Sequence, residues 1–137
     1  KELWWYSCKV GLFNFIIVSF VCFFAILFTP LMIKVLYGDE YFNTIGLSIK
    51  FWIAYGINAG FRMIPLNVLA STGGEKINAV LSVIGCVIHF LIAWFTLTVI
   101  GIEILPVAMS IVYIFVGCCA WFALLFKCRR NQKKNEY

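Results

Sequence analysis

Four stretches of the chain are almost wholly apolar, and short polar segments separate them. They cover roughly residues 10–33, 45–70, 77–100 and 105–126. A helix needs about 20 apolar residues to cross a hydrocarbon core of about 30 Å, and each stretch reaches that length. Strands of a membrane barrel would be about half as long and would alternate apolar with polar residues. The pattern predicts an all-α membrane protein with four transmembrane helices.

The polar links between these stretches are short and cover residues 34–44, 71–76 and 101–103. Short links make consecutive helices antiparallel neighbours. Four antiparallel helices bring both ends of the chain to the same face of the membrane. Pro30, close to the first link, is expected to kink its helix because proline removes a backbone donor.

The distribution of charge distinguishes the two membrane faces. The face with both chain ends carries Lys1, Lys9, Lys76 and a basic tail over residues 127–137. The opposite face carries charges of both signs, at Lys34, Asp39, Glu40, Lys50 and Glu103. Because Lys and Arg concentrate in cytoplasmic segments, we expect both ends to be cytoplasmic.

Composition agrees with a bilayer environment. The sequence is 64% hydrophobic and 12% charged, whereas soluble domains are nearer half apolar and a quarter charged. The net charge of +5 is concentrated in the C-terminal tail, which is typical of a cytoplasmic membrane end rather than a nucleic-acid-binding segment. The chain opens at Lys1 without an initiator Met or a removable leader, so we expect a piece of a longer protein.

The second stretch carries the residues that most favour a binding site. Tyr55, Asn58 and Arg62 recur at helical steps and share one face. Arg62 lies about 12 Å from the end of its helix at 1.5 Å per residue. Its guanidinium either snorkels to the interface or faces a polar interior, where it can hold a phosphate or carboxylate. Candidate substrate-binding residues are Arg62, Asn58, Tyr55 and Lys50, of which Lys50 lies closest to a helix end.

The third stretch has a narrow face of small or polar residues. They recur at steps of three and four: Asn78, Ser82, Gly85, His89, Ala93 and Thr96. In lipid, such faces allow helices to approach one another closely. His89, the single histidine, is placed near the bilayer centre, where it serves either as a proton relay or as a packed, hydrogen-bonded side chain.

No catalytic or cofactor motif is present in the sequence. It contains no P-loop, no GxGxxG and no HExxH pattern. The six cysteines show no CxxC spacing, which argues against a zinc site and a disulfide framework. We therefore expect a protein without enzymatic activity, metal or cofactor.

Two segments resemble a known transporter family. One runs Pro30-Leu-Met-Ile-Lys-Val-Leu-Tyr-Gly38 and is followed by Glu40-Tyr41, and the other runs from Pro65 to Gly73-Gly-Glu-Lys76. Both are similar to segments of bacterial polysaccharide flippases of the multidrug/oligosaccharidyl-lipid/polysaccharide exporter superfamily. The resemblance implies the last four of about twelve helices, arranged in two bundles around a central cavity.

The same resemblance implies a function and a location. Such a flippase moves lipid-diphosphate-linked oligosaccharide across the bacterial inner membrane by alternating access, in contact with membrane lipids and with its own remaining helices. A multidrug exporter of the superfamily is an alternative, although a cavity for cationic drugs would favour carboxylates and the four stretches contain none. A second alternative is a four-helix membrane scaffold without transport activity.

The charge pattern predicts the result of a topology experiment. In a variant without native cysteines, Asp39→Cys should react with a membrane-impermeant maleimide added outside the cell, and Arg130→Cys should react only after the membrane is opened. The reverse labelling pattern would invert the predicted orientation.

Overall fold

The computed structural model describes residues 2–134 and the side chains of residues 2–130. Almost all of this chain is helical. The elements are α1 (Glu2–Tyr37), η1 (Asp39–Thr44), α2 (Ile45–Ile57), η2 (Asn58–Arg62), α3 (Met63–Ser71), α4 (Glu75–Phe95), η3 (Thr96–Ile100), η4 (Ile102–Ile104) and α5 (Leu105–Lys134). The prediction of an all-α fold is confirmed for the described residues.

Three helical segments are long and apolar enough to cross a membrane: Glu2–Tyr37, Glu75–Ile100 and Ile102–Arg130. They contain the first, third and fourth apolar stretches. The predicted single helix over 45–70 is instead interrupted. It consists of α2, a π-helical turn (η2) and α3, which follow one another without a gap. The hydropathy of this stretch did not indicate the π turn.

The helices also extend beyond the predicted apolar boundaries. Helix α1 begins at Glu2 rather than near residue 10, and α5 continues to Lys134. The basic segment is therefore a helical extension of α5, and not a separate tail, as far as residue 134; residues 135–137 lie outside the described residues. Hydropathy marks the part of a helix suited to lipid, whereas Glu, Lys and Arg are good helix formers that let the helix continue.

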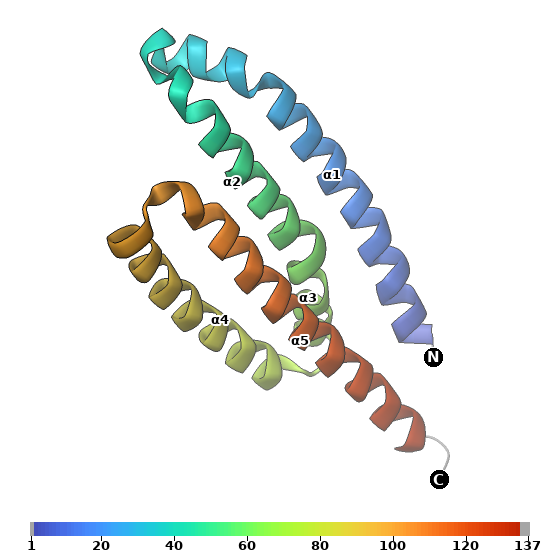
Figure 1. Ribbon diagram of the computed structural model, residues 1–137. Coiled ribbons are helices and arrows are strands. Elements are labelled where there is room, and N and C mark those ends of the chain that lie inside the picture. The colour runs from blue at the N-terminus through green and yellow to red at the C-terminus, as the bar shows by residue number, and fades with distance from the viewer. Residues whose placement is uncertain (1, 135–137) are drawn as a thin grey trace.

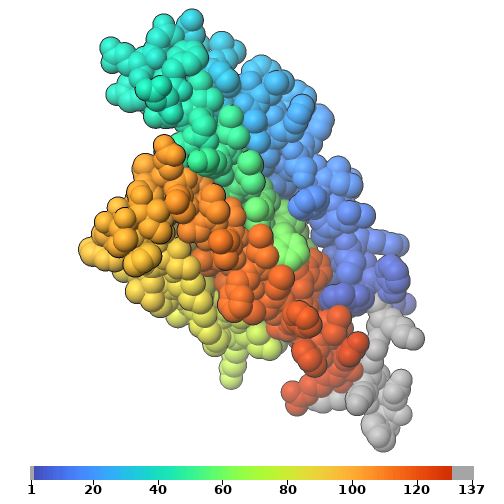
Figure 2. Space-filling view, viewed as in Figure 1, coloured from blue at the N-terminus to red at the C-terminus, as the bar shows by residue number. Residues whose placement is uncertain are grey.

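The segment α2–η2–α3 lies between α1 and α5 (Figure 1). The chain reverses direction at η1, so α2 returns along α1, and α4 packs against α3 and α5. The first turn of α1 and the last turns of α5 lie at the same end of the molecule. Figure 2 shows the green α2–η2–α3 segment as a narrow strip between blue α1 and orange α5. Helix α1 continues through Pro30, and its axis bends over the last turns (Figure 1).

Large apolar side chains project outward along the long helices. Phe13, Trp94 and Phe126 are 67%, 65% and 65% exposed. Contiguous exposed apolar surface of this extent is uncommon on a soluble monomer, and in a bilayer it faces lipid. The buried apolar cluster, by contrast, lies between α3 and α5 and consists of Leu66, Leu69, Ala120, Leu124 and Cys128.

The turn between α3 and α4 is held by a combination of backbone and side-chain bonds. Gly73 adopts φ +77°, a left-handed conformation that glycine reaches without strain. The Gly74 N–H then bonds to the Leu69 carbonyl at 2.7 Å. From α5, the Lys127 ammonium donates to the Thr72 carbonyl at 2.5 Å. A cation at the C-terminal end of a helix is also favoured by the helix dipole.

Gly74→Ala should destabilise this turn. An added Cβ would lie 2.8 Å from the Leu69 carbonyl oxygen and 3.0 Å from Lys127 Nζ, and the backbone oxygen cannot move away without breaking the turn. We expect the free energy of unfolding to fall by about 1–3 kcal/mol, measured by thermal unfolding in detergent. Gly46→Ala in α2 is the control, because a Cβ there meets nothing within 4 Å. Equal stability of the two variants would contradict the described turn.

Candidate functional site

The π-helical turn at the middle of the second apolar stretch positions Arg62. In this turn, the Met63 N–H bonds to the carbonyl of Asn58, five residues earlier, and not to that of Ala59. Pro65 follows and has no N–H, so the carbonyl of Phe61, four residues earlier, also loses its regular helical donor. The π turn and Pro65 therefore deprive two carbonyl groups, those of Ala59 and Phe61, of the donor that a regular α-helix would give them.

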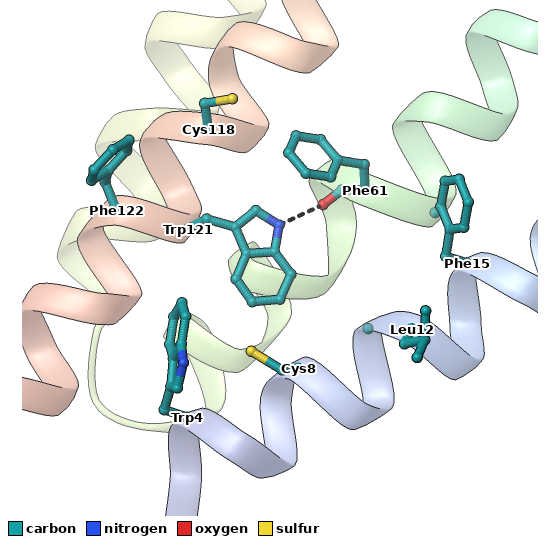
Figure 3. A pocket seen from close by; sticks show the side chains of 10 residues that line it. Trp4, Cys8, Leu12, Phe15, Phe61, Cys118, Trp121 and Phe122 are labelled. Carbon is teal, nitrogen blue, oxygen red and sulfur yellow. Dashed lines mark hydrogen bonds between the residues drawn. The ribbon is translucent and has the colours of Figure 1, made fainter. Parts of the chain in front are cut away.

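Side chains from the two flanking helices supply these partners. Asn14 of α1 donates its amide N–H to the Ala59 carbonyl at 2.9 Å. Trp121 of α5 donates its indole N–H to the Phe61 carbonyl at 3.3 Å, as Figure 3 shows. Proline in a membrane helix is tolerated where neighbouring helices satisfy the freed carbonyl in this way. The turn that carries Arg62 is thus fixed from both sides.

Arg62 lies among polar and aromatic groups instead of carboxylates. Its Nη1 donates to Asn58 Oδ1 at 2.9 Å, and its Cζ lies 5.5 Å from the centre of the Tyr113 ring in α5. The Arg62 Nε is buried and has no hydrogen-bond acceptor among the described residues. A guanidinium has five N–H donors, so donors remain for a further ligand.

His89 of α4 joins the same group of side chains. Its ring centre lies 5.6 Å from that of Tyr113, with the two rings tilted by 30°. We call Asn58, Arg62, His89 and Tyr113 the Arg62 cluster; its members come from η2, α4 and α5. The ion pair found within residues 2–130 joins the exposed side chains of Lys34 and Asp39 at 3.7 Å. No described carboxylate therefore forms an ion pair with Arg62.

The small-residue face predicted for the third stretch lies on the inner side of α4 and of the first residue of η3. Every member is buried or partly buried: Asn78, Ser82, Gly85, His89, Ala93 and Thr96. A Cβ added at Gly85 would lie 3.6 Å from Arg62 Nη2. The absence of a side chain at Gly85 therefore lets α4 approach the guanidinium closely.

A cavity of about 450 Å³ adjoins the cluster between α2 and α5. Asn58 and Tyr113, which both contact Arg62, line it together with Ser48, Phe51, Trp52, Ala54, Tyr55 and Met109. Tyr55 is 53% exposed at this cavity. The predicted residues Arg62, Asn58 and Tyr55 are thus close together, and His89 reaches them through Tyr113.

Lys50 does not belong to this site. It is exposed and borders a separate depression with Ile53, Ile57, Pro106, Val107 and Ser110. Ser48, Phe51 and Trp52 lie at the same level of α2 and do line the 450 Å³ cavity. Lys50 is separate because it borders a different side of the helix. Sequence analysis also missed the contact of Tyr113 with Arg62, although Tyr113, Ser110 and Gly117 lie at helical spacing on one side of α5.

Comparison with protein-family models, with curated proteins and with solved structures gives no match.

The chemistry that the cluster offers is cationic hydrogen bonding. Residues 2–134 contain no group of three or more His, Cys, Asp or Glu side chains that could hold a metal ion. A guanidinium surrounded by an amide, a phenol and an imidazole is suited to an anion, in particular phosphate.

Asn14→Leu should weaken the support of this turn. The substitution removes the amide donor to the Ala59 carbonyl. We expect the free energy of unfolding to fall by about 1 kcal/mol, measured by thermal unfolding in detergent. Ser19→Leu, at an exposed position of the same helix, is the matched control and should be neutral. A neutral Asn14→Leu would mean that the bond to Ala59 contributes nothing to stability.

Proposed function

We propose that the protein is an integral membrane protein with four antiparallel transmembrane helices. Three of them are the long apolar segments Glu2–Tyr37, Glu75–Ile100 and Ile102–Arg130. The fourth is the continuous helical run over residues 45–71, which is about 40 Å long at 1.5 Å per residue and so exceeds a hydrocarbon core. Its irregular backbone is compatible with lipid because α1 and α5 satisfy the freed carbonyls.

We further propose that these helices form part of a transporter for a substrate with an anionic head group. The observation that carries the proposal is a guanidinium inside an apolar helix, beside a cavity, that forms no ion pair with any described carboxylate. Ionisable residues at such depth mark substrate or ion pathways, because an isolated charge there is costly. The spare donors of Arg62 match the oxygens of a phosphate.

The resemblance to polysaccharide flippases specifies this substrate as a lipid-diphosphate-linked oligosaccharide. In this proposal, the chain lies in the bacterial inner membrane with both termini of this segment in the cytoplasm. Further helices of the same transporter complete the cavity, and alternating access moves the diphosphate past Arg62. The diphosphate supplies the opposite charge that the four helices lack.

The two alternatives account for the site less fully. A cavity for cationic drugs would favour carboxylates, but the described acidic residues lie at helix ends and turns: Glu2, Asp39, Glu40, Glu75 and Glu103. A scaffold without transport activity is favoured by one observation, because Asn58 and Tyr113 already hold the guanidinium within the chain. It leaves unexplained the cavity that borders both residues.

Substitutions at Arg62 separate transport from packing. Arg62→Ala should reduce export of surface polysaccharide at least about tenfold, since it removes charge-assisted hydrogen bonds to the diphosphate. Arg62→Lys keeps the charge but loses the planar fork, so export should also fall several-fold. The measurement is restoration of surface polysaccharide by the full-length protein, with membrane levels checked by immunoblot.

Lys50→Gln is the matched control, because it removes a cation from the same helical run but outside the Arg62 cluster. It should export at the wild-type rate. Normal export by Arg62→Gln at normal abundance would show that Arg62 only packs and would favour the scaffold alternative.

A further inference from the structure

A second cavity lies at the opposite end of the helices from the η1 turn. Its volume is about 420 Å³, and it is bordered by the α3–α4 turn and by one face of α5. The lining residues are Gly73, Gly74, Ile77, Ala123, Phe126, Lys127 and Arg130. It shares no lining residue with the Arg62 cluster.

The lining of this cavity is divided into a cationic part and an apolar part. Lys127 and Arg130 are three residues apart on α5, so their side chains project from the same side of the helix. Neither forms an ion pair with a described carboxylate, including that of the neighbouring Glu75. Ile77, Ala123 and Phe126 supply the apolar part, and Phe126 is 65% exposed.

The position of the two cations along α5 corresponds to the head-group region of a bilayer. The apolar part of α5 covers residues 105–126, about 33 Å of helix, which matches a hydrocarbon core of about 30 Å. Lys127 follows directly. Apolar side chains therefore face the start of the acyl region, and the cations face the phosphates.

The glycine turn leaves the room that a head group needs. Gly73 and Gly74 border the cavity without side chains, and a Cβ at Gly74 would lie 3.0 Å from Lys127 Nζ. The bond from Lys127 to the Thr72 carbonyl holds the ammonium at this edge. The first turn of α4 begins here as well, and its N–H groups lack carbonyl partners within the helix.

We propose that this cavity binds the phosphate head group of an anionic phospholipid. Lys127 and Arg130 contact the phosphate oxygens, while Ile77 and Phe126 contact the first methylenes of the acyl chains. A zwitterionic lipid fits less well, because its ammonium would lie next to the two cations. Free phosphate has the same charge but leaves the apolar part of the cavity unfilled.

The test is lipid binding to the purified full chain in nonionic detergent, followed by native mass spectrometry. Phosphatidylglycerol should bind saturably at one site, and phosphatidylcholine should bind at least about fivefold more weakly. Equal binding of the two lipids would overturn the proposal. Inorganic phosphate is titrated in a separate arm; binding of phosphate that depends on Arg130, without binding of phosphatidylglycerol, would also overturn it.

Neighbouring arginines provide the matched pair of variants. Arg130→Gln should weaken phosphatidylglycerol binding about fivefold, whereas Arg129→Gln, which is exposed and does not line the cavity, should have little effect. Equal weakening by both would indicate diffuse attraction to the basic helix and refute a defined site. Ile77→Trp, which keeps every charge but fills the cavity, should weaken binding as well; unchanged binding would exclude this cavity.

Discussion

Inside a bilayer, every backbone carbonyl needs a hydrogen-bond donor from the protein itself, and the π turn and Pro65 remove the regular α-helical donors of the Ala59 and Phe61 carbonyls. Asn14 and Trp121 supply the donors, one from α1 and one from α5. An unsatisfied group in hydrocarbon costs several kcal/mol. The bonds from α1 and α5 therefore stabilise the irregular turn and help to hold the central segment between these two helices.

The same irregularity gives the Arg62 cluster its geometry. A π turn contains one residue more than an α turn, so it rotates the following residues relative to the preceding ones. Asn58 and Arg62 lie at the two ends of that turn and hydrogen-bond to each other. Tyr113 and His89 complete the surroundings from α5 and α4. The positive charge of Arg62 is stabilised by the Asn58 amide and by the Tyr113 ring. Both stabilise a cation less than a carboxylate does, so the guanidinium can still bind an anion.

Four of the described cations differ in their environments: Lys34, Lys50, Lys127 and Arg62. Lys34 and Lys50 are exposed near the η1 end, where charged heads reach water at little cost. Lys127 is partly buried at the other end and binds a backbone carbonyl while bordering a cavity. Arg62 lies deep in the second apolar stretch and is partly buried. The two cavities near Lys127 and Arg62 therefore differ in depth, and each provides a separate place for a phosphate group.

The helical class, the three long apolar segments and the inward face of α4 and η3, from Asn78 to Thr96, could be predicted from hydropathy and periodicity. These properties depend on residues within one helix, whose spacing the sequence states directly. The contact of Arg62 with Tyr113 could not be predicted in this way, since Tyr113 lies 51 positions later and only packing of α5 brings it near. The π turn, the separation of Lys50 from the site and the bonds from Asn14 and Trp121 were likewise decided by tertiary structure. The bonds from Asn14 and Trp121 depend on which neighbouring helix can reach the irregular turn, and the separation of Lys50 depends on how α5 packs against α2. Residue spacing within a single helix contains no such information.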